Sequence, residues 1–226
     1  MGPIFMADNL ILIFGIIGLV GSVSIAIADL LMLLSRKQIP MIDRVGDVWL
    51  RAPTRVFIGG PAAVAIVFPM WAAGMVPVTY GLLGSWMSWP AVIGLCAFAY
   101  AGSFAHGLFP IVGALIGVQE RYKDDPSASQ ALAEIRSVYD NYFRFTVYVT
   151  MIILLVGSIF FSLAVWSGET QYPRSFAIAN PFLWILFHMS TLKWWPHAIS
   201  RWWRPMSVHL FYTPFYILST YLLLNS

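Results

Sequence analysis

The chain has 226 residues, of which 59% are hydrophobic and only 10% are charged. A soluble globular domain carries roughly 25% charged residues, so this composition excludes an ordinary soluble domain and indicates a protein embedded in a lipid bilayer. The formal net charge is +3, but the placement of the basic residues accounts for it without a nucleic-acid partner.

Six apolar stretches are long enough to cross a bilayer. A hydrocarbon core about 30 Å thick needs roughly 20 apolar residues in a helix that rises about 1.5 Å per residue. We therefore predict an all-α fold: a polytopic transmembrane helical bundle of six spans, forming a single domain over residues 1–226. The spans are predicted at about 9–35, 55–82, 90–118, 141–167, 178–196 and 205–224.

The basic residues predict the orientation of this bundle. Twelve of the 13 lysines and arginines fall in the first, third and fifth loops and their flanks, and only Arg174 falls on the opposite side. Basic loops stay in the cytoplasm, so both termini are predicted to lie outside it, N-out and C-out. The N-terminal apolar run has no basic flank and no small-residue cleavage site, so we expect a retained span and not a signal peptide.

The first two spans carry residues that a plain lipid-facing helix does not need. Asp29 lies inside the first apolar run, on its small-residue face. Two interpretations stay open: an inward-facing functional carboxylate, or an anchor that pairs with a loop arginine. The second span contains Pro61, Pro69 and Pro77, which predict a kinked or interrupted helix because each proline removes a backbone hydrogen bond.

The third span carries an ionisable side chain, His106, in its apolar sequence. Its helical face is otherwise made of small residues, including Gly102, Ser103 and Gly113, so another helix can approach it closely. An ionisable group inside a membrane is costly unless it faces a partner or a cavity. His106 is therefore a candidate site residue, with a structural hydrogen bond to a neighbouring helix as the alternative.

The polar segment that follows predicts the start of a long helix. Asp125 precedes Pro126, the arrangement of a carboxylate N-cap before a proline at the first helical position. We expect a polar helix through Glu134 and Arg136 that continues into the fourth span. The outer loop after that span contains no cluster typical of a ligand site.

The sixth span has a polar stripe. Side chains that can form hydrogen bonds recur on one helical face at His209, Tyr212, Thr213, Tyr216 and Thr220. Lipid would penalise this face, so we expect it to be buried inside the bundle. It predicts either a polar pocket or a ladder of hydrogen bonds between helices.

Helix rise places three ionisable residues in the cytoplasmic half of the bilayer. His106 and His209 both fall about 24 Å from the outer edge of the bilayer core, and Asp29 falls near the inner boundary. The sequence thus predicts a binding site in the cytoplasmic half of the bundle. Its candidate residues are Asp29, His106, His209, Tyr212, Thr213 and Tyr216.

No sequence motif assigns a reaction or a metal. The chain has no Walker loop, no zinc-protease motif, no nucleophile elbow and no haem-attachment motif, so no catalytic and no metal-ligating residues are predicted. Cys96 is the single cysteine. The cofactor stays unassigned, and haem between His106 and His209 is a minor option because their depths match.

Three short fragments carry a resemblance: A-D-L-L at the end of the first span, A-H-G-L-F-P-I-V-G in the third, and N-P-F-L-W from Asn180. Together they resemble uncharacterised bacterial multi-pass membrane proteins of about this size. The resemblance implies a multi-pass protein of the bacterial inner (plasma) membrane and implies no activity.

Three functions remain open at this stage. The first is binding or transport of a small or amphiphilic molecule through the polar pocket in the cytoplasmic half, which we favour. The second is an accessory or structural subunit that docks on other membrane subunits through its small-residue faces. The third is a membrane-embedded enzyme for a lipid or isoprenoid, with His106 and Asp29 as acid and base. The lipid bilayer is the one partner that all three share.

Overall fold

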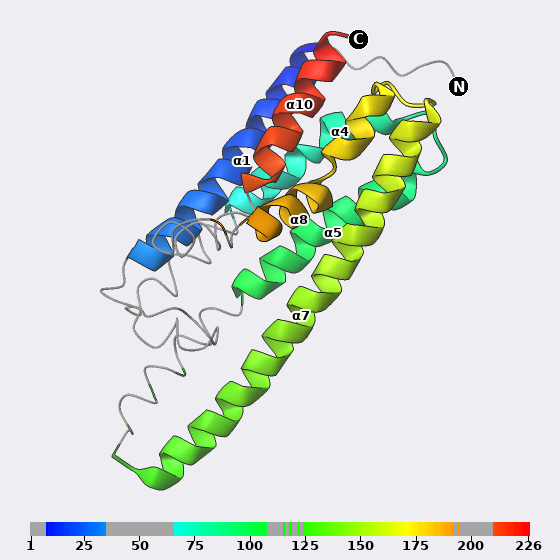
Figure 1. Cartoon of the computed structure of the whole chain (residues 1–226). Helices are drawn as coiled ribbons and strands as arrows, with labels where there is room; N and C mark the ends of the chain where they lie inside the picture. Colours follow the sequence, from blue (N-terminus) through cyan, green and yellow to red (C-terminus); the bar gives the residue numbers. More distant parts are fainter. Residues whose placement is uncertain are drawn as a thin grey trace.

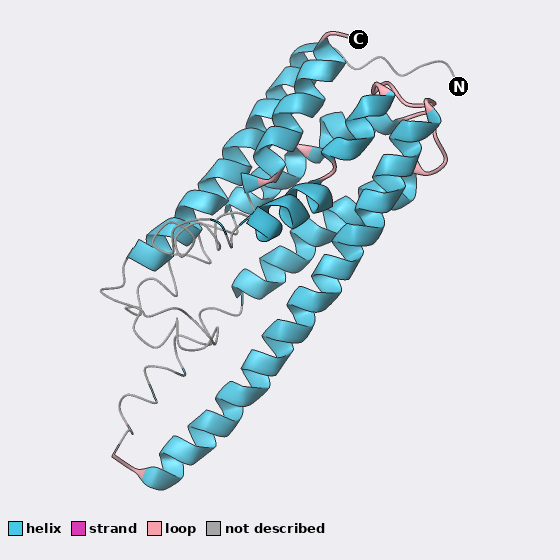
Figure 2. Ribbon diagram, viewed as in Figure 1, coloured by secondary structure: helices cyan, strands magenta, loops and turns pink. Residues whose placement is uncertain are grey.

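The computed structural model of the protein describes residues 8–34, 66–107, 124–191 and 210–226, with isolated positions at 115, 118, 122 and 194. These residues form helices joined by turns, and no strand occurs among them (Figure 2). The all-α prediction is confirmed for this part of the chain. The elements are α1 (Asp8–Leu34), a helix at 66–73, α4 (Met75–Leu82), α5 (Ser88–Gly107), α7 (Pro126–Ser167), the 3₁₀ helix η1 (Arg174–Ala179), α8 (Pro181–Thr191) and α10 (Tyr212–Leu224).

Two of the described helices are long and apolar enough to cross a membrane. They are α1, through Asp8–Ile27, and α7, within Pro126–Ser167. Shorter apolar helices cover Ile66–Leu82 and Ser88–Phe98. A helical protein with two helices able to span a membrane is thus observed, whereas the six-span count stays a prediction.

The long helix α7 begins and ends at the residues that the sequence favours. The Asp125 carboxylate accepts hydrogen bonds from the backbone N–H groups of Ser127 and Ala128, at 3.0 and 3.2 Å, and Pro126 occupies the first turn. The helix ends at Gly168, which adopts the left-handed conformation with φ of 78°. The predicted N-cap and the continuous helix into the fourth span are both confirmed. With 42 residues α7 is about 63 Å long, and it projects well beyond the other helices (Figure 1).

The Asp125 cap makes the first turn of α7 sensitive to pH. Hydrogen bonds from the Ser127 hydroxyl, then from the Ala128 and Ser127 N–H groups, hold the pKa of the Asp125 carboxyl below its ordinary value. The stabilisation is therefore present above the ordinary carboxyl pKa and is lost as the pH falls through the lowered folded value.

We expect Asp125→Ala to reduce the amide protection factors of Ser127 and Ala128 in hydrogen exchange, because these N–H groups lose their acceptor. The wild type should lose the same protection as the pH falls below about 4. Asp124→Ala, which removes the adjacent exposed carboxylate, is the control and should leave both amides protected. Equal protection in the two variants would contradict the cap.

Paired glycines let α5 and α7 touch along their backbones. A Cβ built on Gly157 would lie 2.7 Å from the carbonyl carbon of Gly94 and 2.8 Å from its Cα. Contact this close is possible only where neither residue has a side chain. Leu95, Leu154 and Phe161 are fully buried around this crossing and form part of the core.

A second crossing joins α1 to α10 and to the helix at 66–73. The pairs Gly15 with Thr220, Gly18 with Tyr216 and Ser22 with Thr213 are in contact, so α1 and α10 run antiparallel (Figure 1). Gly18 also meets the backbone of Gly74. The small-residue face predicted for the first span is therefore the face that packs against other helices.

The predicted interruption of the second span occurs at Gly74, between the helix at 66–73 and α4. Pro77 lies three residues later and cannot donate to the carbonyl of Ala73, so the helical hydrogen-bond series breaks there. Pro69 lies within the helix at 66–73. The prediction that proline interrupts this span is confirmed at Pro77, and Pro61 lies outside the described residues.

The region predicted as the fifth span begins differently. Residues 174–179 form η1, and regular helix starts only at Pro181, later than the expected 178. The reason is local: the Asn180 side chain accepts from the Leu183 N–H at 2.9 Å and donates to Ser162 Oγ at 2.8 Å, which caps α8 at its first proline. The described helix α8 has 11 residues, about 17 Å, which is shorter than a full span.

Candidate functional site

The three ionisable residues predicted to meet lie at or beyond the edge of the described residues. Asp29 is in the C-terminal part of α1, and His106 is the last residue but one of α5. Both helices end on the side of the bundle from which α7 projects (Figure 1). The side chains of Asp29 and His106 and the whole of His209 fall outside the described residues, so the convergence of the three stays a prediction.

The polar stripe of the sixth span lies on the described helix α10. Tyr212 and Tyr216 are completely buried, and Thr213 and Thr220 are half-buried. The prediction that this face turns away from lipid is therefore confirmed for both tyrosines. Their role in binding a ligand is a separate prediction that burial does not test.

Two members of the stripe form hydrogen bonds to other helices. The Tyr216 hydroxyl donates to the Trp71 carbonyl oxygen at 2.7 Å. The Ser22 hydroxyl donates to the Leu19 carbonyl at 3.0 Å, so the Thr213 hydroxyl is the donor in its 2.8 Å bond to Ser22. These bonds correspond to the hydrogen-bond ladder that was the structural alternative for this face.

Tyr212 is the stripe residue whose buried hydroxyl finds no partner within the described part of the chain. Its ring packs edge-on against the Trp71 ring, with 4.5 Å between the ring centroids, and stacks on the Phe98 ring, with 5.7 Å between the centroids. Its hydroxyl has no hydrogen-bond partner among the described residues. A buried hydroxyl without an acceptor or donor costs free energy, so Tyr212 is the stripe residue best suited to a contact with a group outside the described chain.

The loop after α7 contributes a buried tyrosine that sequence reasoning missed. The Tyr172 ring packs against Gly81 of α4, and its hydroxyl lies 2.6 Å from Ser219 Oγ of α10. Burial raises the pKa of the Tyr172 hydroxyl above its usual range, and the bond to Ser219 offsets part of that rise. The Gln171 N–H donates to the Gly81 carbonyl at 2.9 Å, so the loop closes the end of α4. Tyr172 thus belongs to the core although it lies between two predicted spans.

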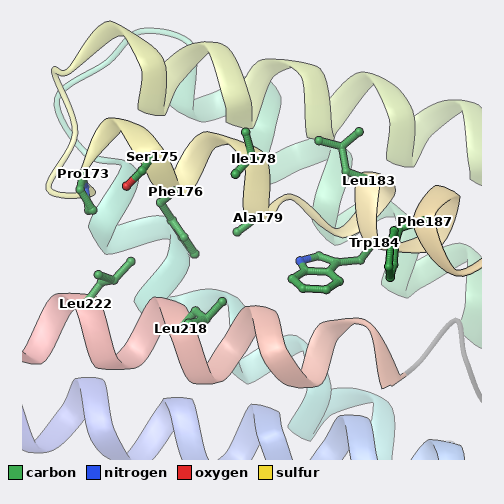
Figure 3. Close-up of a pocket in the computed structure, with 10 residues that line it drawn as sticks. All are labelled: Pro173, Ser175, Phe176, Ile178, Ala179, Leu183, Trp184, Phe187, Leu218 and Leu222. Carbon is green, nitrogen blue, oxygen red and sulfur yellow. The ribbon is translucent and has the colours of Figure 1, made fainter.

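A groove runs between α10 on one side and η1 with α8 on the other (Figure 3). Its volume is about 640 Å³, within the range of about 300–1,000 Å³ found for small-molecule sites. The lining side chains are almost all apolar, and Ser175 is the one hydroxyl among them: Pro173, Ser175, Phe176, Ile178, Ala179, Leu183, Trp184, Phe187, Leu218 and Leu222.

The geometry of the groove comes from the loop and the cap of α8. The 3₁₀ helix and the capping Asn180 position α8 so that the Trp184 ring lies on its side toward α10, the helix that carries Leu218 (Figure 3). The Trp184 indole N–H has no hydrogen-bond acceptor among the described residues. The apolar lining of the groove suits a hydrocarbon chain or ring. It would exclude a charged group, because no side chain in the lining carries an opposite charge.

The described residues offer no metal site, because they contain no group of three histidine, cysteine or acidic side chains close enough to share an ion. Cys96 is a single half-buried thiol. The sequence predicted no metal-ligating residues, and that stays a prediction.

A family model matches residues 6–220, which is nearly the whole chain. The chain belongs to this family of unknown function (DUF6796). No curated protein and no solved structure matches the chain. Membership in DUF6796 thus carries no activity over to the chain, and the function has to be argued from the groove and the bundle.

Proposed function

We propose that this DUF6796 protein is a multi-pass membrane protein that binds an amphiphilic molecule and holds its apolar part in the groove between α8 and α10. The observation that carries this proposal is the groove itself, with about 640 Å³ of volume and an almost wholly apolar lining. A hydrocarbon chain is the ligand chemistry that such a lining recognises.

The outer surface of the bundle supports a lipid environment for this groove. Large apolar side chains point outward on several helices, including Ile13 (49% exposed), Ile66 (71%) and Ile93 (65%). Trp86 in the turn before α5 and Trp89 in the first turn of α5 are also exposed, and aromatic side chains commonly mark the membrane interface. An aqueous protein rarely exposes so much apolar surface.

The proposal includes the six spans with both termini outside, in the inner membrane of a bacterium. The charge distribution supports this orientation, and the resemblance to bacterial multi-pass proteins supports the location. In this orientation the groove lies in the outer half of the bundle, because it is lined by the outer loop and by the C-terminal part of α10.

Within this proposal, binding is favoured over transport. Between the groove and the cytoplasmic end of the bundle, the core is filled by aromatic rings packed edge to face, which include Trp71, Tyr212 and Phe215, all essentially buried. Passage of a molecule would require these rings to separate. The polar site predicted from Asp29, His106 and His209 would then be a second site at the inner end.

The test is to fill the groove and to measure retained lipid. The protein is purified from phosphatidylglycerol nanodiscs, and the phospholipid that stays bound is measured by native mass spectrometry. We expect Leu218→Trp to reduce the amount of bound phospholipid about tenfold, because the larger ring occupies the apolar groove. Ile217→Trp is the matched control: Ile217 is the next residue of α10, is 50% exposed and does not line the groove.

The control decides between a groove and general lipid adhesion. Retention should be unchanged in Ile217→Trp and reduced in Leu218→Trp. Equal retention in the two variants, or no phospholipid retained by the wild type, would rule out the groove as the binding site.

A further inference from the structure

The longest helix, α7, carries an unpartnered apolar stripe with a heptad repeat. Starting at Ile135, exposed apolar side chains recur at alternating intervals of three and four residues, at Val138, Tyr142, Phe145, Val149 and Ile152, and the pattern continues without a break to Trp166. Each of these side chains is between 36% and 68% exposed. Alternating spacings of three and four are the pattern of residues that face a partner in a coiled coil.

The other face of α7 already has its partner. Leu154 and Phe161 are fully buried, and Gly157 meets the backbone of Gly94 on α5. The stripe lies on the part of α7 that α5 does not cover. It is therefore a second packing face, and nothing in the described residues occupies it.

Lipid accounts for only part of this stripe. At about 63 Å, α7 is roughly twice as long as the hydrocarbon core of a bilayer is thick. The last charged residue of the helix is Arg144, and the 19 residues from 126 to 144 add about 28 Å beyond the apolar segment. Ile135, Val138 and Tyr142 lie in this extension and are 44%, 68% and 49% exposed.

Polar side chains flank the stripe in this extension, as on a helix that meets water. Glu134, Ser137 and Asn141 are exposed beside the stripe. The stripe keeps one heptad register from the apolar segment of α7 into the extension. Contact with lipid chains would end at the headgroups, so a second helix explains the continuous stripe better than lipid does.

We propose that the stripe of α7 pairs with the α7 helix of a second copy of this chain. Two copies inserted with the same orientation in one membrane have parallel helices, so a twofold axis along the membrane normal sets equal residues opposite each other. Ten side chains that are about half exposed offer on the order of 1,000 Å² per chain, against the roughly 800 Å² per partner of a standard interface. The stripe is thus large enough for a stable dimer, and the groove between α8 and α10 takes no part in it.

Cysteine cross-linking of the extension tests this pairing. In a Cys96→Ala background, Val138→Cys places a thiol on the stripe, and Ala133→Cys places one on the opposite side of the same helical segment, at another exposed position. In a parallel dimer the two Val138 positions face each other at a separation that a disulfide can bridge. On mild oxidation of the full-length protein in proteoliposomes, we expect at least tenfold more covalent dimer from Val138→Cys than from Ala133→Cys.

Two further measurements keep the test decisive. Tyr142→Cys, one step along the stripe, should cross-link as Val138→Cys does, so a local defect at one position does not decide the result. Val138→Lys should convert the dimer to a monomer by mass in nanodiscs, while Ala133→Lys should not. Cross-linking that is absent or equal on both sides of the helix would overturn the proposal. A stripe covered by another segment of the same chain, or by lipid, would give that result.

Discussion

Replacement of Gly157 by leucine is expected to separate α5 from α7 and to lower the free energy of unfolding by about 3 kcal/mol, the upper end of the usual cost of overpacking. A Cβ alone would already lie 2.7 Å from the carbonyl carbon of Gly94, and backbone atoms cannot move aside as a flexible side chain can. Gly157→Ala should give an intermediate loss. The measurement is thermal unfolding in detergent, followed by circular dichroism.

The residue beside Gly94 on α5 provides the control for this prediction. Ile93 is 65% exposed, so Ile93→Leu should change the unfolding midpoint little. A Gly157→Leu protein that unfolds at the same temperature as Ile93→Leu would show that the glycine contact does not hold these helices together.

Tyr216→Ala is expected to cost about 3–5 kcal/mol, the range for loss of a large buried aromatic side chain. The ring is 1% exposed and fills the space that Gly18 and Gly74 leave where three helices meet. Its removal would leave a cavity among α1, α10 and the helix at 66–73. Unfolding by denaturant in mixed micelles measures the loss.

Tyr216→Phe separates packing from hydrogen bonding. This variant keeps the ring and loses only the bond to the Trp71 carbonyl, which still accepts from the Gly74 N–H at 3.2 Å. The expected cost is about 1 kcal/mol, because the carbonyl is not left without a donor. If Tyr216→Phe destabilised the protein as much as Tyr216→Ala, the hydrogen bond and not the packing would fix α10.

Features with a local physical cause could be predicted from the sequence. Asp125 before Pro126 predicted where α7 begins, because a carboxylate cap and a proline act within one turn. The glycine and serine positions of the first span predicted its packing face. The stripe of the sixth span predicted which side of α10 is buried, because polar groups avoid lipid whatever helix lies opposite.

Features that depend on the rotation and contact of helices could not be predicted in this way. A span that is apolar on every side does not indicate which face meets which neighbour. The sequence therefore did not identify the hydrogen-bond partners of Tyr216 and Thr213. Tyr172 and the groove depend on how the loop after α7 folds back on α4 and α10. The short helix α8 was expected to start earlier, since the hydropathy of residues 178–180 does not reveal the cap at Asn180.

The central claim is that the groove between α8 and α10 holds the apolar part of an amphiphilic ligand, and a structure determined in phosphatidylglycerol nanodiscs tests it most directly. We predict an elongated density along the groove, in contact with Leu218 and the Trp184 ring. A structure in which these walls are well ordered and the space between them is closed by side chains, or empty of lipid, would contradict the claim.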